Sequence, residues 1–295
     1  MTEAPVVVVS GYASIDEIYS ASRLAGAAQT GVLSGPVRPA PRHGGCGPNT
    51  ARVLATLHVP TALVTWVGDD PEGRAFVEAL ADAGVSMDAV EVGRGPSPRS
   101  LLIYDADGDA ACYFHPSGSA SQVVGPSIQE LVAAARWLTI TVGPAEVSAA
   151  LLDARRANTR LAWGVKGDAV AFPPELCRRL AQADVICLNR HELEFVARAL
   201  SISRTPEALL DEGAGCVVLT RGAEGYAVVT RDGSFEGRAQ PVIVADLTGA
   251  GDAFLAGLLA GLVDGEEPTA AASRGAEVAR NYLLDKAQSQ IEVVR

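Results

Sequence analysis

The sequence predicts an α/β fold in which a doubly wound, mostly parallel sheet is flanked by helices and carries a small β-sheet lid. Two observations support this. Short β-branched runs alternate with Ala- and Leu-rich segments of helical period along most of the 295 residues, which is typical of a parallel sheet covered by helices. Two stretches, at about 13–43 and 91–116, lack helical period and carry Gly, Pro and short alternating segments, as β-hairpins do. We therefore expect one domain over residues 1–295, with these two stretches as lid insertions.

The elements of the main sheet follow in order along the chain. Core strands are expected where Val, Ile and Leu form short apolar runs, at residues 6–10, 62–66, 137–141, 161–165, 185–188 and 216–220. Helices are expected where apolar residues recur at helical spacing, at residues 49–57, 74–83, 127–135, 145–158, 175–181, 192–200 and 253–262. Sheets of this kind bind ligands beyond the carboxyl ends of their strands, so a functional site is expected there.

The composition is that of an ordinary globular protein. The formal net charge is -11 and the pI is near 4.9, so neither nucleic acid nor a membrane is expected as a partner. The five cysteines are scattered without a C-x-x-C pair, which is typical of reduced thiols. The apolar runs at 6–9 and 253–263 are too short for a signal sequence and for the roughly 20 residues of a membrane span. We therefore expect a cytoplasmic location.

The most informative segment is a turn of three small residues at 249–251 that lies between Asp246 and Asp252 and leads into an apolar helical stretch. Small residues let backbone N–H groups approach a charged oxygen, and the start of a helix adds its positive dipole end. An aspartate in the first helical turn can act as a base on a hydroxyl beside a bound phosphate. The segment therefore predicts phosphoryl transfer to an alcohol; a helix start capped by Thr248 or Asp246 is the simpler alternative.

Two segments suit a polyhydroxylated ligand. Asp16 follows the first strand, where a carboxylate can accept hydrogen bonds from two neighbouring hydroxyls of a sugar. Gly44 and Gly45 precede a helix that starts near Asn49, so the backbone can approach a ligand closely and the Asn49 amide can both donate and accept. The alternatives are a solvated turn aspartate and a plain loop before a helix capped by Asn49.

Two further segments suit a nucleotide and its metal ion. Asn189 and Glu192 emerge at the end of the strand at 185–188, and oxygen ligands suit Mg²⁺, which keeps several waters and needs only one or two protein contacts. Thr220, Gly222 and Gly225 leave the strand at 216–220, where a glycine-rich backbone can contact a phosphate. The alternatives are a helix start with an acid in its first turn and a tight turn.

The order and spacing of these motifs resemble those of the ribokinase family, also called the PfkB carbohydrate kinase family, and the resemblance covers essentially the whole chain. Residues 246–252 match its D-T-x-G-A-G-D signature, with Leu247 in a variable position. Residues 44–49 match its G-G-x-x-x-N signature, residues 68–73 resemble its G-x-D-x-x-G element, and residues 189–192 match N-x-x-E. The resemblance implies a ribokinase-like fold and a kinase that transfers the γ-phosphoryl group of ATP to a primary hydroxyl.

The resemblance also implies a role for each matching residue. Asp252 is the expected general base, and the expected anion hole is formed by the amides of Gly249, Ala250 and Gly251. Glu192 is expected to hold Mg²⁺ through water, and Asp246 to lie beside a site for a monovalent cation, K⁺. The expected nucleotide-binding residues are Lys166, Asn189, Thr220, Gly222 and Gly225. The expected acceptor-binding residues are Ser14, Asp16, Gly44, Gly45 and Asn49. The lid of the family often doubles as a dimer surface, which suggests a homodimer.

Departures from the family pattern bear on the acceptor. Ser14 replaces an asparagine that many members place two residues before the substrate aspartate, and residues 141–144 lack the glutamate that ribokinases carry there, which argues against a ribose-specific pocket. The expected acceptor is a sugar or sugar derivative, and a nucleoside is the nearest alternative.

Aromatic residues leave that alternative open. Tyr12, Phe114 and His115 are placed to line a slot for a base, whereas in the simpler reading Phe114 and Tyr113 pack the lid. From a different class, the chain could bind a sugar or nucleotide without turnover, as a regulator.

Overall fold

The structure, a computed structural model, describes residues 5–36, 41–106, 110–242, 244 and 246–292. Within these residues one large sheet of nine strands has the order β14-β13-β12-β11-β10-β9-β1-β5-β6. Its strands are β1 (Val7–Ser10), β5 (Thr61–Gly68), β6 (Val90–Gly93), β9 (Trp137–Ile140), β10 (Arg160–Gly164), β11 (Val185–Asn189), β12 (Val217–Thr220), β13 (Tyr226–Thr230) and β14 (Gly233–Gly237). Neighbours from β6 to β12 pair in parallel, and β13 and β14 add an antiparallel edge. The predicted fold class is therefore confirmed.

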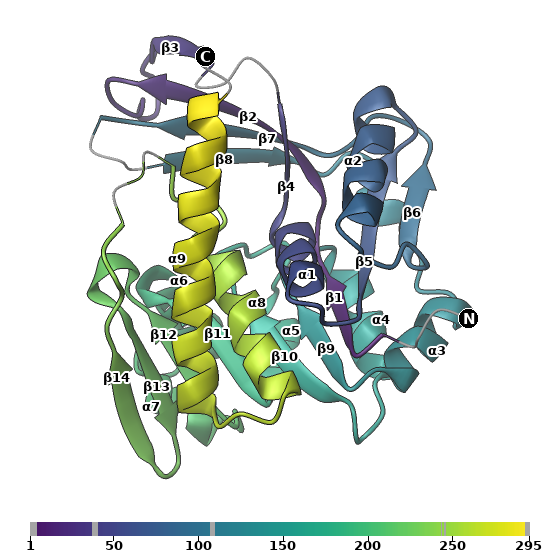
Figure 1. The fold of residues 1–295 in the computed structure, drawn as a ribbon, viewed down its shortest axis with the longest axis vertical. Helices are drawn as coiled ribbons and strands as arrows, with labels where there is room; N and C mark the ends of the chain where they lie inside the picture. The colour runs from purple at the N-terminus through teal and green to yellow at the C-terminus, as the bar shows by residue number, and fades with distance from the viewer. Residues whose placement is uncertain (1–4, 37–40, 107–109, 243, 245, 293–295) are drawn as a thin grey trace.

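Helices cover both faces of this sheet, as Figure 1 shows. One face packs against α1 (Cys46–Thr56), α2 (Pro71–Asp82), α8 (Ala250–Val263) and α9 (Pro268–Glu292). The other face packs against α3 (Pro126–Ala134), α4 (Ala145–Ala154), α5 (Pro174–Leu180), α6 (Arg190–Leu200) and α7 (Pro206–Asp211). The strands between them are buried on both sides, as in β5, where every residue is buried. The continuous apolar runs of the sequence therefore reflect double burial.

A second, smaller sheet lies at the top of Figure 1 and forms the lid. Its strands have the order β3-β2-β7-β8, and β4 also pairs with β2. They are β2 (Ser14–Ala21), β3 (Leu33–Pro36), β4 (Arg42–Gly44), β7 (Arg99–Tyr104) and β8 (Ala110–His115). The lid exposes large apolar side chains, among them Val32 at 80% and Tyr113 at 63%. Pairing of two copies through the lid stays a prediction.

Most of the expected elements are present, and the differences have local causes. Helix α4 ends at Ala154 rather than at residue 158, because Arg155 is extended (φ -66°, ψ 135°). Residues 91–93, expected in the lid, lie instead in β6, which pairs with β5 in the large sheet. The structure adds α7, β13, β14 and α9, which the sequence pattern did not predict.

Helix α9 packs closely along α8 and runs from the base of that helix towards the lid (Figure 1). The two backbones approach through glycines: a Cβ atom at Gly257 would lie 2.8 Å from the Gly275 Cα, and one at Gly261 would lie 2.8 Å from the Ala271 Cα. Larger side chains at these positions would push the helices apart. This contact fixes where α9 lies relative to the first turn of α8.

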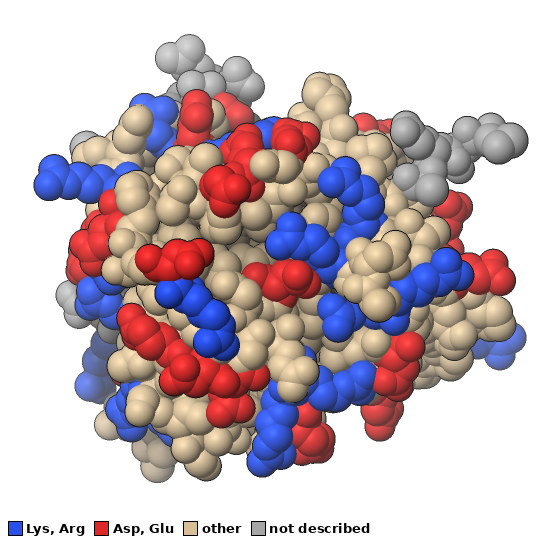
Figure 2. Space-filling view, turned by 90° about the horizontal axis from the view of Figure 1, so that it is seen from below, with Lys and Arg blue, Asp and Glu red and all other residues tan. Residues whose placement is uncertain are grey.

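The surface carries both signs of charge. On the face shown in Figure 2, basic side chains are interspersed with acidic ones rather than gathered in a wide basic area. In the part of the chain that the structure describes, no helix is both long enough and apolar enough to cross a bilayer.

Candidate active site

A cavity of about 530 Å³ lies between the carboxyl ends of the large sheet and the lid. The lid contributes Ser100, Leu102, Tyr104, Cys112 and Phe114 to its wall. The cavity is also lined by most of the residues that the sequence singled out: Ser14, Asp16, Gly45, Asn49, Lys166, Asn189, Glu192, Thr220, Gly249, Gly251 and Asp252. Residues separated by more than 200 positions in the sequence thus meet in one place.

Asp252 lies in the first turn of α8 at the cavity wall. Its Oδ2 accepts a hydrogen bond of 2.8 Å from the Nδ2 of Asn49 on α1. Burial raises the pKa of Asp252 above its ordinary value, while the Asn49 hydrogen bond and the charge of Lys166 oppose that rise. A fixed carboxylate with a raised pKa, at a helix N-terminus, is suited to accept a proton from a hydroxyl group.

The turn before α8 has a geometry that few residues allow. Gly249 caps the helix in the left-handed region (φ 86°), and a Cβ atom there would lie 2.7 Å from the hydroxyl oxygen of Tyr282. Gly251 differs, because a Cβ atom there would meet nothing within 4 Å. Gly249 and Gly251 line the cavity, and the N–H groups of a first helical turn have no acceptor within the helix. The N–H of Ala250 instead donates to the Leu247 carbonyl at 3.2 Å.

Asp16 is held in the cavity wall by its neighbours in the lid. It is 7% exposed and accepts a hydrogen bond from the Ser14 hydroxyl, which is itself 3% exposed. A Cβ atom at Gly44, the residue paired with Ser14 in β4, would lie 2.0 Å from the Asp16 Oδ2. Burial raises the pKa of Asp16, against the lowering effects of Ser14 and Arg42. Gly44 thus makes room for this carboxylate and does not itself line the cavity.

Gly45 and Asn49 connect that wall to α1. Gly45 has a φ of 101°, and a Cβ atom there would lie 2.0 Å from the Tyr12 carbonyl oxygen, so only glycine fits this turn. The Asn49 Oδ1 accepts a 3.0 Å hydrogen bond from Arg52. This bond fixes the orientation of the amide, so that its Nδ2 faces Asp252.

Asn189 and Glu192 form a capping box at the start of α6. The Glu192 N–H donates to the Asn189 Oδ1 at 3.0 Å, and the Asn189 N–H donates to the Glu192 Oε2 at 2.8 Å. Asn189 and Glu192 therefore cap the start of α6 and also line the cavity. Burial raises the pKa of Glu192, opposed by the Asn189 N–H and by Lys166.

These oxygen donors fit Mg²⁺ held through water rather than by a full set of side chains. Among the described residues, no group of three or more His, Cys, Asp and Glu side chains is arranged to hold a metal ion. Lys166 faces the same region, and the Cys46 sulfur, Glu192 and Asp252 together raise its pKa. The site thus presents one ammonium group among several carboxylates.

The glycines expected to contact the nucleotide lie apart from the cavity. Thr220 lines it, whereas Gly222 and Gly225 do not. A Cβ atom at Gly225 would lie 2.1 Å from the Gly237 carbonyl oxygen, so this glycine permits the close pairing of β13 with β14.

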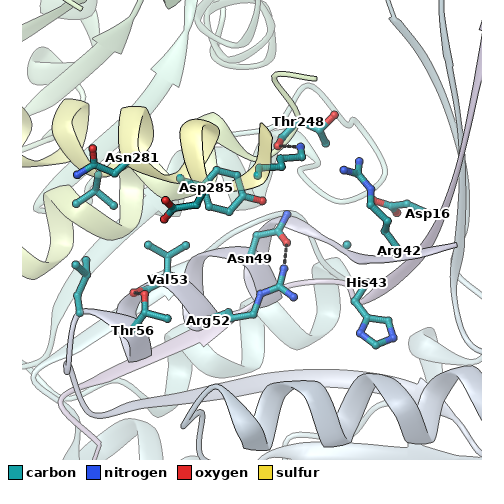
Figure 3. A pocket seen from close by; sticks show the side chains of 15 residues that line it. Asp16, Arg42, His43, Asn49, Arg52, Val53, Thr56, Thr248, Asn281 and Asp285 are labelled. Atoms are coloured by element: carbon teal, nitrogen blue, oxygen red, sulfur yellow. Dashed lines mark hydrogen bonds between the residues drawn. The ribbon is translucent and has the colours of Figure 1, made fainter. Parts of the chain in front are cut away.

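Asp246 lies beside a second pocket, of about 630 Å³, between β4, α1 and α9. In Figure 3, Asp16, Arg42 and Thr248 lie at one end of this pocket, and Val53 and Asn281 at the other. The pocket shares Asp16, Asn49 and Thr248 with the cavity but does not include Asp252. The smaller cavity is therefore the one that holds the reactive groups.

Asp246 itself is bound by two cations. Its Oδ2 lies 2.6 Å from the Arg42 Nη1 and 3.0 Å from the Lys286 Nζ. Its Oδ1 accepts a 2.9 Å hydrogen bond from the Thr248 N–H. Burial alone would raise the pKa of Asp246, but the hydrogen bonds from Thr248 and the two cations outweigh it and hold that pKa well below its usual range.

Several residues of the site were not predicted from the sequence. Arg42 and Tyr104 reach from the lid to the turn before α8, where the Tyr104 hydroxyl contacts the Thr248 hydroxyl. Lys286 comes from α9, which was itself not predicted. The usable signal for α9 was Pro268, a favoured first residue of a helix, followed by an Ala-rich run.

The aromatic residues divide between two roles. Tyr12 and Phe114 both line the cavity, and their ring centroids are 4.7 Å apart. Tyr113 is 63% exposed, and His115 is exposed and bonded to Ser117 through its Nδ1. Phe114 therefore faces the site, while Tyr113 does not pack within the lid.

The fold and this cavity define a phosphotransferase with a hydroxyl acceptor. Residues 6–287 match the sequence profile of the pfkB family carbohydrate kinase. The chain belongs to this family, as its motifs predicted.

Similar proteins differ in the acceptor for which they are named. A fructokinase from Rhizobium leguminosarum bv. trifolii is 28% identical over 236 residues, which cover 76% of this chain and 72% of the fructokinase. A nucleoside kinase from Methanothermobacter thermautotrophicus is 24% identical over 262 residues, which cover 85% of this chain and 81% of that kinase. The structure of a ribokinase from Cryptococcus neoformans var. grubii serotype A in complex with ADP superposes with a TM-score of 0.81 at 20% identity, covering 94% of this chain and 93% of the ribokinase.

Proposed function

We propose that this protein transfers the γ-phosphoryl group of ATP to a primary hydroxyl of a sugar or sugar derivative. The observation that carries the proposal is the position of Asp252. Its carboxylate stands at the N-terminus of α8, is oriented by Asn49 and shares one cavity with Asp16 and Lys166. The ribokinase of similar fold is named as a complex with ADP, which supports a nucleotide as the donor.

In this proposal the acceptor lies on the Asp16 side of the cavity. The buried Asp16 carboxylate accepts hydrogen bonds from two acceptor hydroxyls, and the reacting hydroxyl points towards Asp252. Asp252 takes the proton of that hydroxyl as the oxygen attacks the γ-phosphorus, and the bond from the γ-phosphorus to the bridging oxygen breaks with its electron pair, so that ADP leaves. Because Asn49 holds the Oδ2 of Asp252, the carboxylate keeps its orientation through the reaction.

The transferring group lies at the start of α8. The N–H groups of Gly249 and Gly251 and the positive end of the helix dipole stabilise the charge on its oxygens. Lys166 adds a positive charge on the nucleotide side, next to Glu192 and Asn189. Mg²⁺, when bound through water to Glu192, would neutralise part of the phosphate charge.

A nucleoside is the second candidate acceptor, favoured by the Tyr12 and Phe114 rings. These rings face the cavity together with Leu102 and Cys112 of the lid, and they offer an apolar surface on which a base can stack. The name of the similar nucleoside kinase points the same way. A sugar acceptor is preferred because the buried Asp16 and Ser14 present polar groups suited to hydroxyls.

A coupled assay of ADP release separates these acceptors. The purified protein is incubated with ATP, Mg²⁺ and K⁺ and screened against sugars, sugar phosphates and nucleosides. Turnover of a sugar with a free primary hydroxyl is expected. Turnover restricted to nucleosides would favour the second candidate, and binding without turnover of any compound would favour a regulator.

Glu192→Gln is expected to raise the Mg²⁺ concentration needed for half-maximal rate by roughly 10- to 100-fold. Glutamine can keep the capping box, because its side-chain oxygen still accepts from the Asn189 N–H, but it loses the charge that holds the ion. The measurement is the rate as a function of Mg²⁺ at saturating ATP. Glu194→Gln, on the exposed side of the same helix, is the control. A titration identical to that of the wild type would place the metal elsewhere.

Lys166→Met is expected to move the acidic limb of the kcat/KM profile to higher pH. The positive charge of Lys166 lowers the pKa values of Asp252 and Glu192. Without that charge both carboxylates protonate at higher pH, so the base is lost earlier as the pH falls. Arg179→Met, which removes a cation from an exposed ion pair with Asp153 on the covering helices, should leave the limb in place. An acidic limb that moves to lower pH would contradict the role given to Lys166, which is to lower the pKa values of these two carboxylates.

A further inference from the structure

Lys286 places its ammonium group between two oxygen atoms beside the turn that leads into α8. The Nζ lies 3.0 Å from the Oδ2 of Asp246 and donates to the main-chain carbonyl of Thr248 at 2.6 Å. The Lys286 and Asp246 side chains are 12% and 14% exposed, so solvent screens this contact weakly. A carboxylate and a main-chain carbonyl are also oxygen ligands of the kind that a K⁺ ion accepts.

The contact with Thr248 acts directly on the proposed anion hole. The carbonyl of Thr248 and the N–H of Gly249 belong to one planar trans peptide group, so they point in opposite directions. An ammonium that holds the carbonyl from the α9 side therefore directs the Gly249 N–H towards the cavity, which Gly249 lines. Tyr282, one turn earlier on α9, packs against Gly249 from the same side.

Lysine is rare in this chain, and one of its lysines stands beside Asp246. The chain has two lysines, Lys166 and Lys286, against 22 arginines. Both lysines lie at the proposed phosphoryl-transfer site, whereas the arginines are spread between this site, where Arg42 binds Asp246, and exposed ion pairs such as Arg179 with Asp153. An ammonium is a compact charge with three donors, close in character to a small cation, whereas a guanidinium is planar and extended.

We infer that Lys286 takes the place of a monovalent cation beside Asp246, so that phosphoryl transfer by this kinase does not require K⁺. This inference rests on the proposed function of the Asp252 site and names a positioning residue for it. Lys286 fixes the Thr248 peptide group and does not touch the substrates.

The Lys286 ammonium group occupies the place that a K⁺ ion would take between Asp246 and the Thr248 carbonyl. Arg42 and Lys286 already bring two positive charges to the single carboxylate of Asp246. The second pocket adds Arg52 as a further cation, and its remaining acids are Asp16 and Asp285. A K⁺ ion next to Asp246 would compete with the ammonium for the same oxygen atoms and would be repelled by it.

The first test compares cations on the unmodified protein. Initial rates and thermal unfolding temperatures are measured in KCl and in choline chloride at equal ionic strength. Equal rates and equal unfolding temperatures are expected. Saturable activation by K⁺, or a K⁺-dependent rise in the unfolding temperature, would overturn the inference.

The second test removes the ammonium. Methionine at position 286 ends one atom short of the Lys286 Nζ, which leaves a gap between Asp246 and the Thr248 carbonyl. In choline chloride, Lys286→Met is expected to lower kcat by roughly tenfold, which is less than the 10²–10³ typical of deleting an anion-hole donor. KCl should restore much of the lost rate and should raise the unfolding temperature of this variant alone.

Arg274→Met is the matched control, because it removes a cation from the same helix at an ion pair with Asp264 and should show no dependence on K⁺. A Lys286→Met variant that keeps its full rate in choline chloride, or whose rate is not restored by K⁺, would contradict the inference that Lys286 takes the place of a K⁺ ion. The unfolding temperatures need no substrate. If no acceptor is turned over, the proposed function fails while the cation test still gives its answer.

Discussion

Asp252→Asn should lower kcat by roughly 10²–10⁴, the usual cost of losing a general base, with nucleotide and acceptor binding largely retained. The carboxylate oxygen that meets Asn49 can be replaced by the amide oxygen of the new side chain, so the 2.8 Å hydrogen bond and the fold are kept. The remaining side chain cannot take a proton from the acceptor. Single-turnover rates and equilibrium binding of the nucleotide together measure the two parts of this expectation.

The control for this variant lies at the other end of the same helix. Asp264 follows α8 and forms an exposed ion pair with Arg274, so Asp264→Asn should change neither kcat nor KM. An unchanged kcat in Asp252→Asn would remove the base assignment. A loss of rate that came with lost nucleotide binding would point instead to a damaged fold.

Gly251→Ala should lower kcat by roughly 10²–10³, comparable to deleting an anion-hole donor, without destabilising the protein. The added methyl group would meet no protein atom within 4 Å; it would stand at the cavity wall, where the transferring group must approach the amides. Alanine also restricts the unfolded chain more than glycine, which stabilises by about 0.4–1 kcal/mol where the conformation allows it. The expected result is therefore lower activity together with an equal or higher unfolding temperature.

A second glycine provides the matched control. Gly125 also stands at a helix N-terminus, with a φ of -75° and nothing within 4 Å of an added Cβ atom, but it lies outside the cavity. Gly125→Ala should leave kcat unaltered, because its methyl group lies away from the cavity. Full activity in Gly251→Ala would show that the phosphoryl group does not pass close to this turn.

The fold could be predicted from the sequence because its signals are local. Each core strand is buried on both faces and therefore reads as a short apolar run, such as residues 62–66 within β5. Helix α9 gave no such signal, because much of its buried surface comes from small residues such as Ala271 and Ala272. Its packing depends on close backbone approach to α8, and a one-dimensional pattern does not record that contact.

The site could be predicted only in part, for a related reason. Residues close to a motif, such as Asn49, Glu192 and Asp252, are marked by their neighbours in the sequence. Arg42 and Lys286 are separated from Asp246 by 204 and 40 positions, and they reach it through the register of β4 and the rotation of α9. The sequence predicted a site for K⁺ beside Asp246, and it gave no sign that Arg42 and Lys286 pair with this carboxylate.

The glycine contacts between α8 and α9 have a consequence for Lys286. From Gly275 to Lys286 the helix rises about 16 Å. The Gly257–Gly275 contact therefore acts as the fulcrum of a rigid lever whose far end, Lys286, contacts the turn before α8. A tilt of about 5° at the fulcrum would displace the ammonium by about 1.4 Å over this length, enough to break its bond with the Thr248 carbonyl. The alignment of the turn before α8 is thus sensitive to a distant point where the two helix backbones touch.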